Sequence, residues 1–262
     1  MDSELRRITE RVRAALKHGT ALCVRGGGSK DFYGQPLQGE VLDVSALRGI
    51  ISYEPSELVV TVRAGTTLQE LQAALAEKGQ HLAFEPPCFG RDAAGVSAAT
   101  CGGMVAAGLS GPARASAGAV REFVLGVTLL NGRAELLTFG GQVIKNVAGY
   151  DVSRLMVGAM GTLGVLTQIS LKVLPCAPAE VTLTCAGLDQ QTALNLLHRW
   201  GGQPLPLNAS CWQCEPGATS GRLTVRLRGA QAAVQAALRA PPMARYATLC
   251  WVWSCSMAAP SC

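Results

Sequence analysis

Glycine gathers at three places in this sequence, each next to a run of residues that favours a β-strand. Residues 26–28 are successive glycines behind the apolar segment 21–24, residues 102–103 form a second pair, and residues 158–164 open the long alternating segment 163–174. Glycine lacks a Cβ, so its backbone can take a positive φ or approach a ligand closely. Three such clusters suit an elongated ligand touched at several points. Close packing of backbone against backbone is the alternative explanation for each cluster.

The first cluster carries the most chemistry. A predicted strand leads directly into Arg25, Gly26, Gly27, Gly28, Ser29 and Lys30. Consecutive glycine N–H groups can line one concavity that accepts phosphate oxygens. The Ser29 hydroxyl adds a hydrogen-bond donor, and the Lys30 ammonium adds a positive charge. The sequence contains neither Gly-Lys-Ser/Thr nor G-x-G-x-x-G, which excludes a P-loop and a dinucleotide fingerprint. A phosphate cradle and a solvent-exposed tight loop both stay open at this point.

Composition narrows the class of protein. Hydrophobic residues make up 48% of the 262 residues and charged residues 16%, which favours packed layers around a sizeable core. The net charge of +5 comes without a long basic run, which argues against nucleic-acid binding. The charged N-terminal segment lacks the apolar core of a signal peptide, so we expect a reducing, cytoplasmic setting without disulfides. No apolar run is long enough to span a membrane. Cys211 and Cys214 form a lone CxxC, and no metal site is predicted.

The chain divides into a larger region, residues 1–175, and a smaller one, residues 176–239. In the larger region, residues 67–70 form a capping box at the start of a helix, and the Asn-Gly pair at 131–132 predicts a hairpin with a type I′ turn. Residues 86–119 show almost no helical or strand periodicity. An irregular stretch of that length inside a compact domain is uncommon unless it is functional.

The smaller region alternates in the order β-α-β-β-α, which is the start of an α+β domain that still lacks its last strands. The pattern predicts strands near 181–185, 207–213 and 223–227 and helices near 189–200 and 230–238. Residues 240–262 continue none of these patterns. We therefore expect them to be a divergent tail that ends a truncated or frameshifted reading.

Five segments occur in a specific order: RGGGSK, ATCGGMVAAGLSG, GAVREFVLG, KNVAGYDVSRLMVG and GTLGVLTQISLKVLP. Each one is a weak signal, but the ordered set resembles the FAD-binding domain of the vanillyl-alcohol-oxidase-like, or PCMH-type, flavoproteins. Within that family it most resembles the FAD-binding subunits of glycolate oxidases. The resemblance covers residues 20–175 strongly and 176–238 more weakly. It implies an α+β protein, with a two-subdomain FAD-binding fold over 1–175 and a partial α+β cap domain over 176–239.

The resemblance also implies a cofactor and its binding residues. FAD would be held without a covalent bond, because the family's histidine or cysteine tethers have no match here. The pyrophosphate would lie on the loop that starts at Arg25, and Gly118 would approach the flavin, although Ala117 replaces an aromatic residue common in the family. The expected FAD-binding residues are Arg25, Gly26, Gly27, Gly28, Ser29, Lys30, Pro86, Thr100, Gly102, Gly103, Gly118, Gly164 and Val165.

The implied activity is the oxidation of a 2-hydroxy acid such as glycolate to an oxo acid, with the flavin as the hydride acceptor. The implied partners are a second flavoprotein subunit and an iron–sulfur subunit, through which the complex would contact the inner membrane. No catalytic residue is assigned. Lys145, Asn146 and Tyr150 are candidates for which capping, surface and packing roles are equally open. The alternative is a non-catalytic FAD-binding structural subunit, or a truncated remnant.

Overall fold

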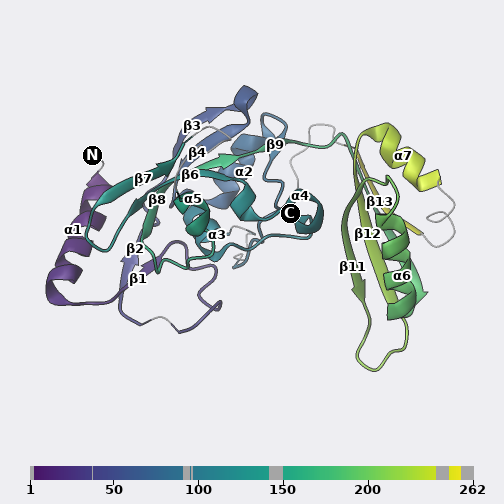
Figure 1. Ribbon diagram of the computed structural model, residues 1–262, viewed down its shortest axis with the longest axis horizontal. Helices are drawn as coiled ribbons and strands as arrows, with labels where there is room; N and C mark the ends of the chain where they lie inside the picture. The colour runs from purple at the N-terminus through teal and green to yellow at the C-terminus, as the bar shows by residue number, and fades with distance from the viewer. Residues whose placement is uncertain are drawn as a thin grey trace. The chain divides into compact units, whose positions relative to one another are not determined.

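The protein folds into two compact units (Figure 1). The computed structural model describes residues 3–36, 38–90, 95, 97–141, 150–239 and 248–254, the last of these by their backbone. Unit 1 comprises Met1–Gly111 and Ala119–Pro175, and unit 2 comprises Pro112–Gly118 and Cys176–Cys262. Both units combine helices with sheets, which agrees with the predicted α+β class.

Unit 1 is built on a five-stranded antiparallel sheet in the order β3-β4-β8-β6-β7. The strands are β3 (Ile50–Glu54), β4 (Val59–Arg63), β6 (Val124–Leu130), β7 (Leu136–Gly140) and β8 (Val165–Lys172). The central strands β4 and β8 pair from Val59 opposite Lys172 to Arg63 opposite Gln168. Successive residues of β4 are buried, so both faces of the sheet are covered at its centre. A short pair, β5 (Gln80–His81) with β9 (Leu174–Pro175), lies apart from it.

Two helices of unit 1 begin at threonine caps. Thr67 caps α2 (Leu68–Ala76) by accepting a 3.2 Å hydrogen bond from the Glu70 N–H, which confirms that half of the predicted capping box. Thr100 caps α3 (Cys101–Ala107) in the same way, through the Gly103 N–H. The helix α3 corrects the prediction that residues 86–119 are irregular. Its two glycines lower helix propensity, and packing against β8 and β4 offsets that cost.

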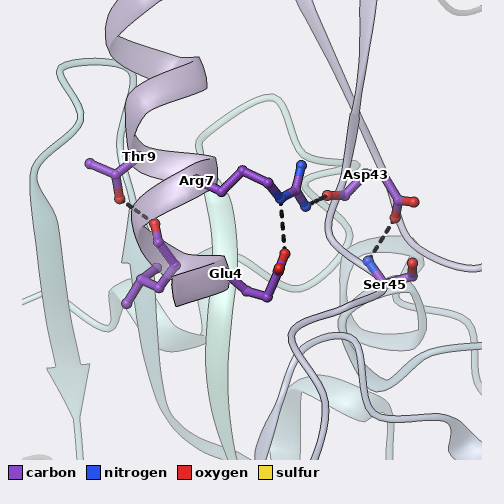
Figure 2. A network of polar contacts seen from close by, with 6 residues as sticks. Glu4, Arg7, Thr9, Asp43 and Ser45 are labelled. Carbon is purple, nitrogen blue, oxygen red and sulfur yellow. Dashed lines mark hydrogen bonds and ion pairs between the residues drawn. The ribbon is translucent and has the colours of Figure 1, made fainter. Parts of the chain in front are cut away.

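The N-terminal helix α1 (Ser3–His18) is tied to the strand β2 (Glu40–Asp43) by polar contacts (Figure 2). The Arg7 guanidinium donates to Glu4 of its own helix at 2.9 Å and to the Asp43 carbonyl at 3.0 Å. The Asp43 carboxylate in turn accepts from the Ser45 N–H at 2.8 Å. Hydrogen bonds from Ser45 lower the pKa of Asp43, which keeps this carboxylate charged. The contacts fix the end of β2.

The strand β1 (Leu22–Arg25) runs parallel to β2, from Leu22 opposite Glu40 to Arg25 opposite Asp43. A parallel pair cannot be joined by a tight turn and needs a long crossover connection. Here that connection is residues 26–39, which begin with the glycine loop. Buried residues of α1 pack with Leu42 and Val44 behind this strand pair. The glycine loop therefore leaves the end of an anchored strand.

The hairpin between β6 and β7 forms, but its turn differs from the predicted type. Leu130 pairs with Leu136, so the connection is a five-residue loop. The residue with positive φ is Ala134, at 59°, whereas a type I′ turn requires positive φ at both central residues. The Asn131 side chain accepts hydrogen bonds from the N–H groups of Arg133 and Glu135. This side-chain bonding to its own loop stabilises the longer connection.

Unit 2 is a four-stranded antiparallel sheet with two helices on one face (Figure 1). Its elements are α4 (Arg114–Ala117), β10 (Ala179–Leu188), α6 (Gln190–Gly201), β11 (Leu207–Gln213), β12 (Gly221–Gly229), α7 (Gln231–Arg239) and β13 (Thr248–Ser254). Alternate residues of β10 and β12 pack with Trp200 of α6 and Val234 of α7. The strand order is β11-β12-β10-β13. The sequence predicted an unfinished sheet, but β13 pairs with β10 and adds an edge strand.

No helix in the described part of the chain is both long enough and apolar enough to cross a membrane.

Candidate cofactor site

Unit 1 contains a cavity of about 130 Å³ at the carboxyl end of β1. The glycine loop forms one wall, and the start of α3 and the turn before β8 form the others. The lining residues are Val24, Arg25, Gly26, Gly27, Gly28, Ser29, Lys30, Asp31, Tyr33, Val44, Ala64, Thr100, Gly102, Gly103, Ala106, Ala107, Met156, Met160, Gly161, Gly164 and Leu166. The three glycine clusters that stand apart in the sequence therefore meet around one cavity.

The glycine loop offers unused hydrogen-bond donors to this cavity. Within the described residues, the N–H groups of residues 26–30 donate to no protein acceptor. Buried or half-buried backbone N–H groups are nearly always paired, so a run without partners requires another acceptor. Consecutive N–H groups around Gly28, which has a φ of 71°, form the kind of concavity that binds anions. The acceptor that fits is an anionic oxygen.

Lys30 adds an uncompensated charge at the same wall. Its ammonium has no ion pair or hydrogen bond among the described residues. Partial burial lowers the pKa of Lys30, because removing water disfavours the charged form. An anion bound in the cavity would reverse that penalty. Lys30 and the loop N–H groups thus favour the same ligand charge.

Arg25 lines the cavity and also pairs with a residue of the loop itself. Its guanidinium binds the Asp31 carboxylate at 2.6 and 2.9 Å, and this hydrogen-bonded pair raises the pKa of Arg25. A Cβ at Gly28 would lie 2.3 Å from the guanidinium, so Arg25 packs directly against the loop. The Arg25–Asp31 pair therefore closes the loop from residue 25 to residue 31 and leaves Lys30 as its uncompensated charge.

The second glycine cluster, Gly102 and Gly103, shapes the cavity wall but offers no free N–H donors. The Cys101 and Gly102 N–H groups donate to the carbonyls of Thr66 and Ala64 at 2.9 and 2.7 Å, and the Gly103 N–H donates to the Thr100 hydroxyl. The first amides of α3 are therefore already satisfied. A Cβ at Gly102 would lie 2.8 Å from the Ala64 side chain, which explains the glycine by close packing. The Thr100 hydroxyl lines the cavity and can still donate its own hydrogen.

Three of the expected residues do not line this cavity: Pro86, Gly118 and Val165. Pro86 is buried outside it, and the side chain of Val165 packs in the core behind β1 and β2. Gly118 belongs to unit 2, where it ends α4 with a φ of 98°. Tyr150 is 96% exposed and does not line the cavity either. Lys145 and Asn146 lie outside the described residues.

Sequence reasoning missed several lining residues, above all Met160 and Gly161. Both belong to the third glycine cluster, but neither was selected. Met160 has a φ of 52°, which is uncommon outside glycine, and its side chain reaches the loop of residue 34. The apolar wall formed by Ala106, Ala107 and Met156 carried no sequence signal, because small and apolar residues are common in any core.

Comparison with known proteins decides which anionic ligand this unit takes. The family model described as "FAD binding domain" matches residues 4–140, which include the glycine loop and α3. The chain belongs to this family. Its cofactor is therefore FAD.

The curated relatives include subunits of glycolate oxidases and a D-lactate dehydrogenase. The chain is 46% identical over 230 residues to the glycolate oxidase subunit GlcE of Escherichia coli, covering 88% of this chain and 62% of that subunit. It is 30% identical to the glycolate oxidase subunit GlcD of Bacillus subtilis, over 64% of this chain and 34% of GlcD. It is 32% identical to a D-lactate dehydrogenase of Anaerostipes hadrus, over 55% of this chain and 29% of that enzyme. The chain thus spans less than two thirds of the length of these relatives.

Among solved structures, the chain resembles alkyldihydroxyacetonephosphate synthase with a TM-score of 0.72 and 14% identity, over 95% of this chain and 51% of that one. At that identity the likeness establishes the fold alone. Together with the family match, it confirms the predicted PCMH-type FAD-binding fold.

The described residues fit part of FAD. Pockets that hold a whole ligand measure about 300–1,000 Å³, whereas this cavity measures about 130 Å³. The unpaired N–H groups and Lys30 suit the pyrophosphate, and the small residues of α3 leave room beside it. The described cavity is therefore smaller than a pocket for the whole cofactor.

Proposed function

We propose that this chain is the FAD-binding subunit of a glycolate or related 2-hydroxy-acid oxidase complex. The observation that carries the FAD site is the run of unpaired N–H groups from residue 26 to residue 30 beside the uncompensated Lys30. The 46% identity to a glycolate oxidase subunit supports the choice of substrate class. The domain organisation that goes with this proposal is an FAD-binding domain over residues 1–175 and a cap domain over 176–239.

The chain's own residues would bind and orient the cofactor. The loop N–H groups and the Ser29 hydroxyl would donate to the pyrophosphate oxygens, and Lys30 would neutralise part of their charge. Arg25 and Asp31 would hold the loop in shape. Gly164 and the Thr100 hydroxyl would border the chain of the cofactor on the other walls. When bound, FAD supplies a two-electron acceptor for the carbon that bears the substrate hydroxyl.

A second candidate is a subunit that binds FAD without oxidising substrate itself. The ionisable side chains that line the described cavity are Arg25, Lys30, Asp31 and Tyr33. Of these, Asp31 is paired with Arg25, so the described wall offers no carboxylate or histidine free to accept a hydroxyl proton. In this candidate the described wall would bind the cofactor, and another subunit would carry the chemistry.

The partners of this proposal are a second flavoprotein subunit and an iron–sulfur subunit that passes electrons toward the membrane. The likeness to both GlcE and GlcD supports a complex with a flavoprotein of related fold. Contact with the membrane would then run through the partners from a cytoplasmic position.

The test is the absorbance of the purified, FAD-loaded chain under anaerobic conditions. Added glycolate should bleach the flavin, and acetate, which lacks the hydroxyl, should not. Bound flavin that stays oxidised with glycolate, yet bleaches once the partner flavoprotein is present, would favour the structural subunit. A chain that retains no FAD would contradict both candidates.

A further inference from the structure

An exposed aromatic pair stands beside the glycine loop and plays no part in the site described above. Phe32 and Phe89 pack edge to face, with ring centroids 5.2 Å apart and an interplanar angle of 84°. The exposed fractions of Phe32 and Phe89 are 68% and 37%. Large apolar side chains grouped on a surface often mark a binding site. Neither ring lines the cavity, so the pair lies outside its walls.

The backbone holds this pair against the phosphate-binding loop. Phe32 lies between Asp31 and Tyr33, which both line the cavity. On the other side, a Cβ at Gly90 would lie 3.4 Å from the Ser29 Cα, so the segment that carries Phe89 touches the loop. The Ser97 hydroxyl fixes that segment by donating to the Phe89 carbonyl at 2.9 Å. Phe32 is thus carried by the connection that begins with the glycine loop, and Phe89 by a segment that touches this loop.

We propose that Phe32 and Phe89 form a stacking surface for one of the two planar ring systems of FAD, an inference that rests on the proposed FAD site. FAD carries adenine on one side of its pyrophosphate and isoalloxazine on the other. With the pyrophosphate on residues 26–30, the cavity is too small for the whole cofactor. The part that extends past Ser29 and Asp31 reaches the aromatic pair. Aromatic side chains stack on planar heterocycles with little dependence on their identity.

Phe32 is available for such a contact. A ring that is 68% exposed buries little of its surface in the free protein. A ring stacked on it would bury that surface. Because the Phe32 side chain is 68% exposed, its replacement should leave the fold of unit 1 intact.

The experiment is a calorimetric titration of the full chain with FAD, FMN and ADP. The variants are Phe32→Ala, Phe32→Leu, which keeps apolar bulk without a ring, and Phe32→Tyr, which keeps the ring. Leu136→Ala is the matched control, because Leu136 is an exposed apolar residue (46%) on β7 and outside the cavity. Stacking on one base contributes enough that loss of the ring should raise the Kd of FAD about 10-fold or more.

The proposal predicts that Phe32→Ala and Phe32→Leu weaken FAD binding while Phe32→Tyr and Leu136→Ala do not. Weaker ADP binding with unchanged FMN binding would identify adenine as the stacked ring, and the reverse would identify isoalloxazine. Wild-type affinity in Phe32→Ala or Phe32→Leu would overturn the proposal, as would equal losses for ADP and FMN, which would indicate a disturbed loop. If the wild-type chain binds no FAD, the proposed function itself fails.

Discussion

At the scale of single residues, Lys30 is the side chain whose environment most directly requires an anion. It is half-buried and has no partner among the described residues. Replacing it by methionine keeps its length and removes its charge. A hydrogen bond to a charged group contributes about 1.5–3 kcal/mol, so Lys30→Met should raise the Kd of FAD by about 10- to 100-fold. Lys78→Met, at an exposed position after α2, is the control and should bind FAD as the wild type does. Equal affinity of the two variants would remove Lys30 from the site.

The same residue predicts how FAD binding depends on pH. Burial lowers the pKa of Lys30 in the free protein, and the bound pyrophosphate should raise it again. Between those two pKa values the complex holds a proton that the free protein has lost, so the affinity for FAD falls as the pH rises through this window. The stability of the FAD-free chain should change in the opposite direction. Its folded pKa lies below the unfolded one, so the free energy of unfolding rises with pH over the interval between them.

Titrations at several alkaline pH values measure the first effect, and denaturant unfolding of the FAD-free chain measures the second. In Lys30→Met, the FAD affinity and the free energy of unfolding should both change less with pH, because the proton of Lys30 is absent. A variant with the same slopes as the wild type would show that another group titrates.

At the scale of elements, the glycine loop is shaped by its contact with the segment before α3. A Cβ at Gly27 would lie 1.6 Å from the Ala98 carbonyl oxygen, and a Cβ at Gly26 would lie 2.5 Å from the Thr100 hydroxyl. Close packing of backbone therefore explains Gly26 and Gly27, and the packed loop forms one wall of the cavity. Overpacking a site typically costs about 1–3 kcal/mol. Because the clash is severe, Gly27→Ala should destabilise unit 1 by about 3 kcal/mol, the upper end of that range.

Thermal unfolding and FAD titration of Gly27→Ala measure this effect, and Gly132→Ala is the control. A Cβ at Gly132 would meet no atom within 4 Å, and Gly132 has no positive φ. Gly132→Ala should unfold and bind FAD as the wild type does. An unchanged midpoint in Gly27→Ala would mean that the loop can move away from Ala98 without cost.

The elements also show which parts of the fold could be predicted from the sequence. β8, β11 and β12 carry alternating residues, and the prediction found them within a few residues of their bounds. The helix α3 was missed, because its glycines hide a helix that tertiary packing stabilises. β13 was missed although its sequence, TLCWVWS, is rich in residues that favour strands, because its partner β10 lies far away in the sequence. The cavity was predicted through its glycine and polar residues, while Met156 and Met160 gave no signal that distinguishes a wall from a core.

At the scale of the whole molecule, the two units have separate cores, and the residues that line the cavity at the glycine loop all belong to unit 1. In unit 2, β13 pairs with β10 from Ala179 opposite Ser254 to Thr184 opposite Thr248. A variant that ends at residue 239 loses this strand and leaves that edge of β10 unpaired. Unpaired edges template aggregation, so the shortened chain should unfold at a lower temperature in unit 2 and aggregate at a lower concentration.

FAD binding should separate the two units in the same experiment. A ligand that binds only the native form of one unit stabilises that unit by about 2.7 kcal/mol at a concentration of 100 Kd. Added FAD should therefore raise the unfolding midpoint of unit 1 equally in the full and shortened chains, because the described cavity walls all lie before residue 240. The midpoint of unit 2 should fall on shortening whether FAD is present or not. If shortening instead abolishes the FAD-dependent shift, the segment after residue 239 contributes to the cofactor site, and the two units unfold as one.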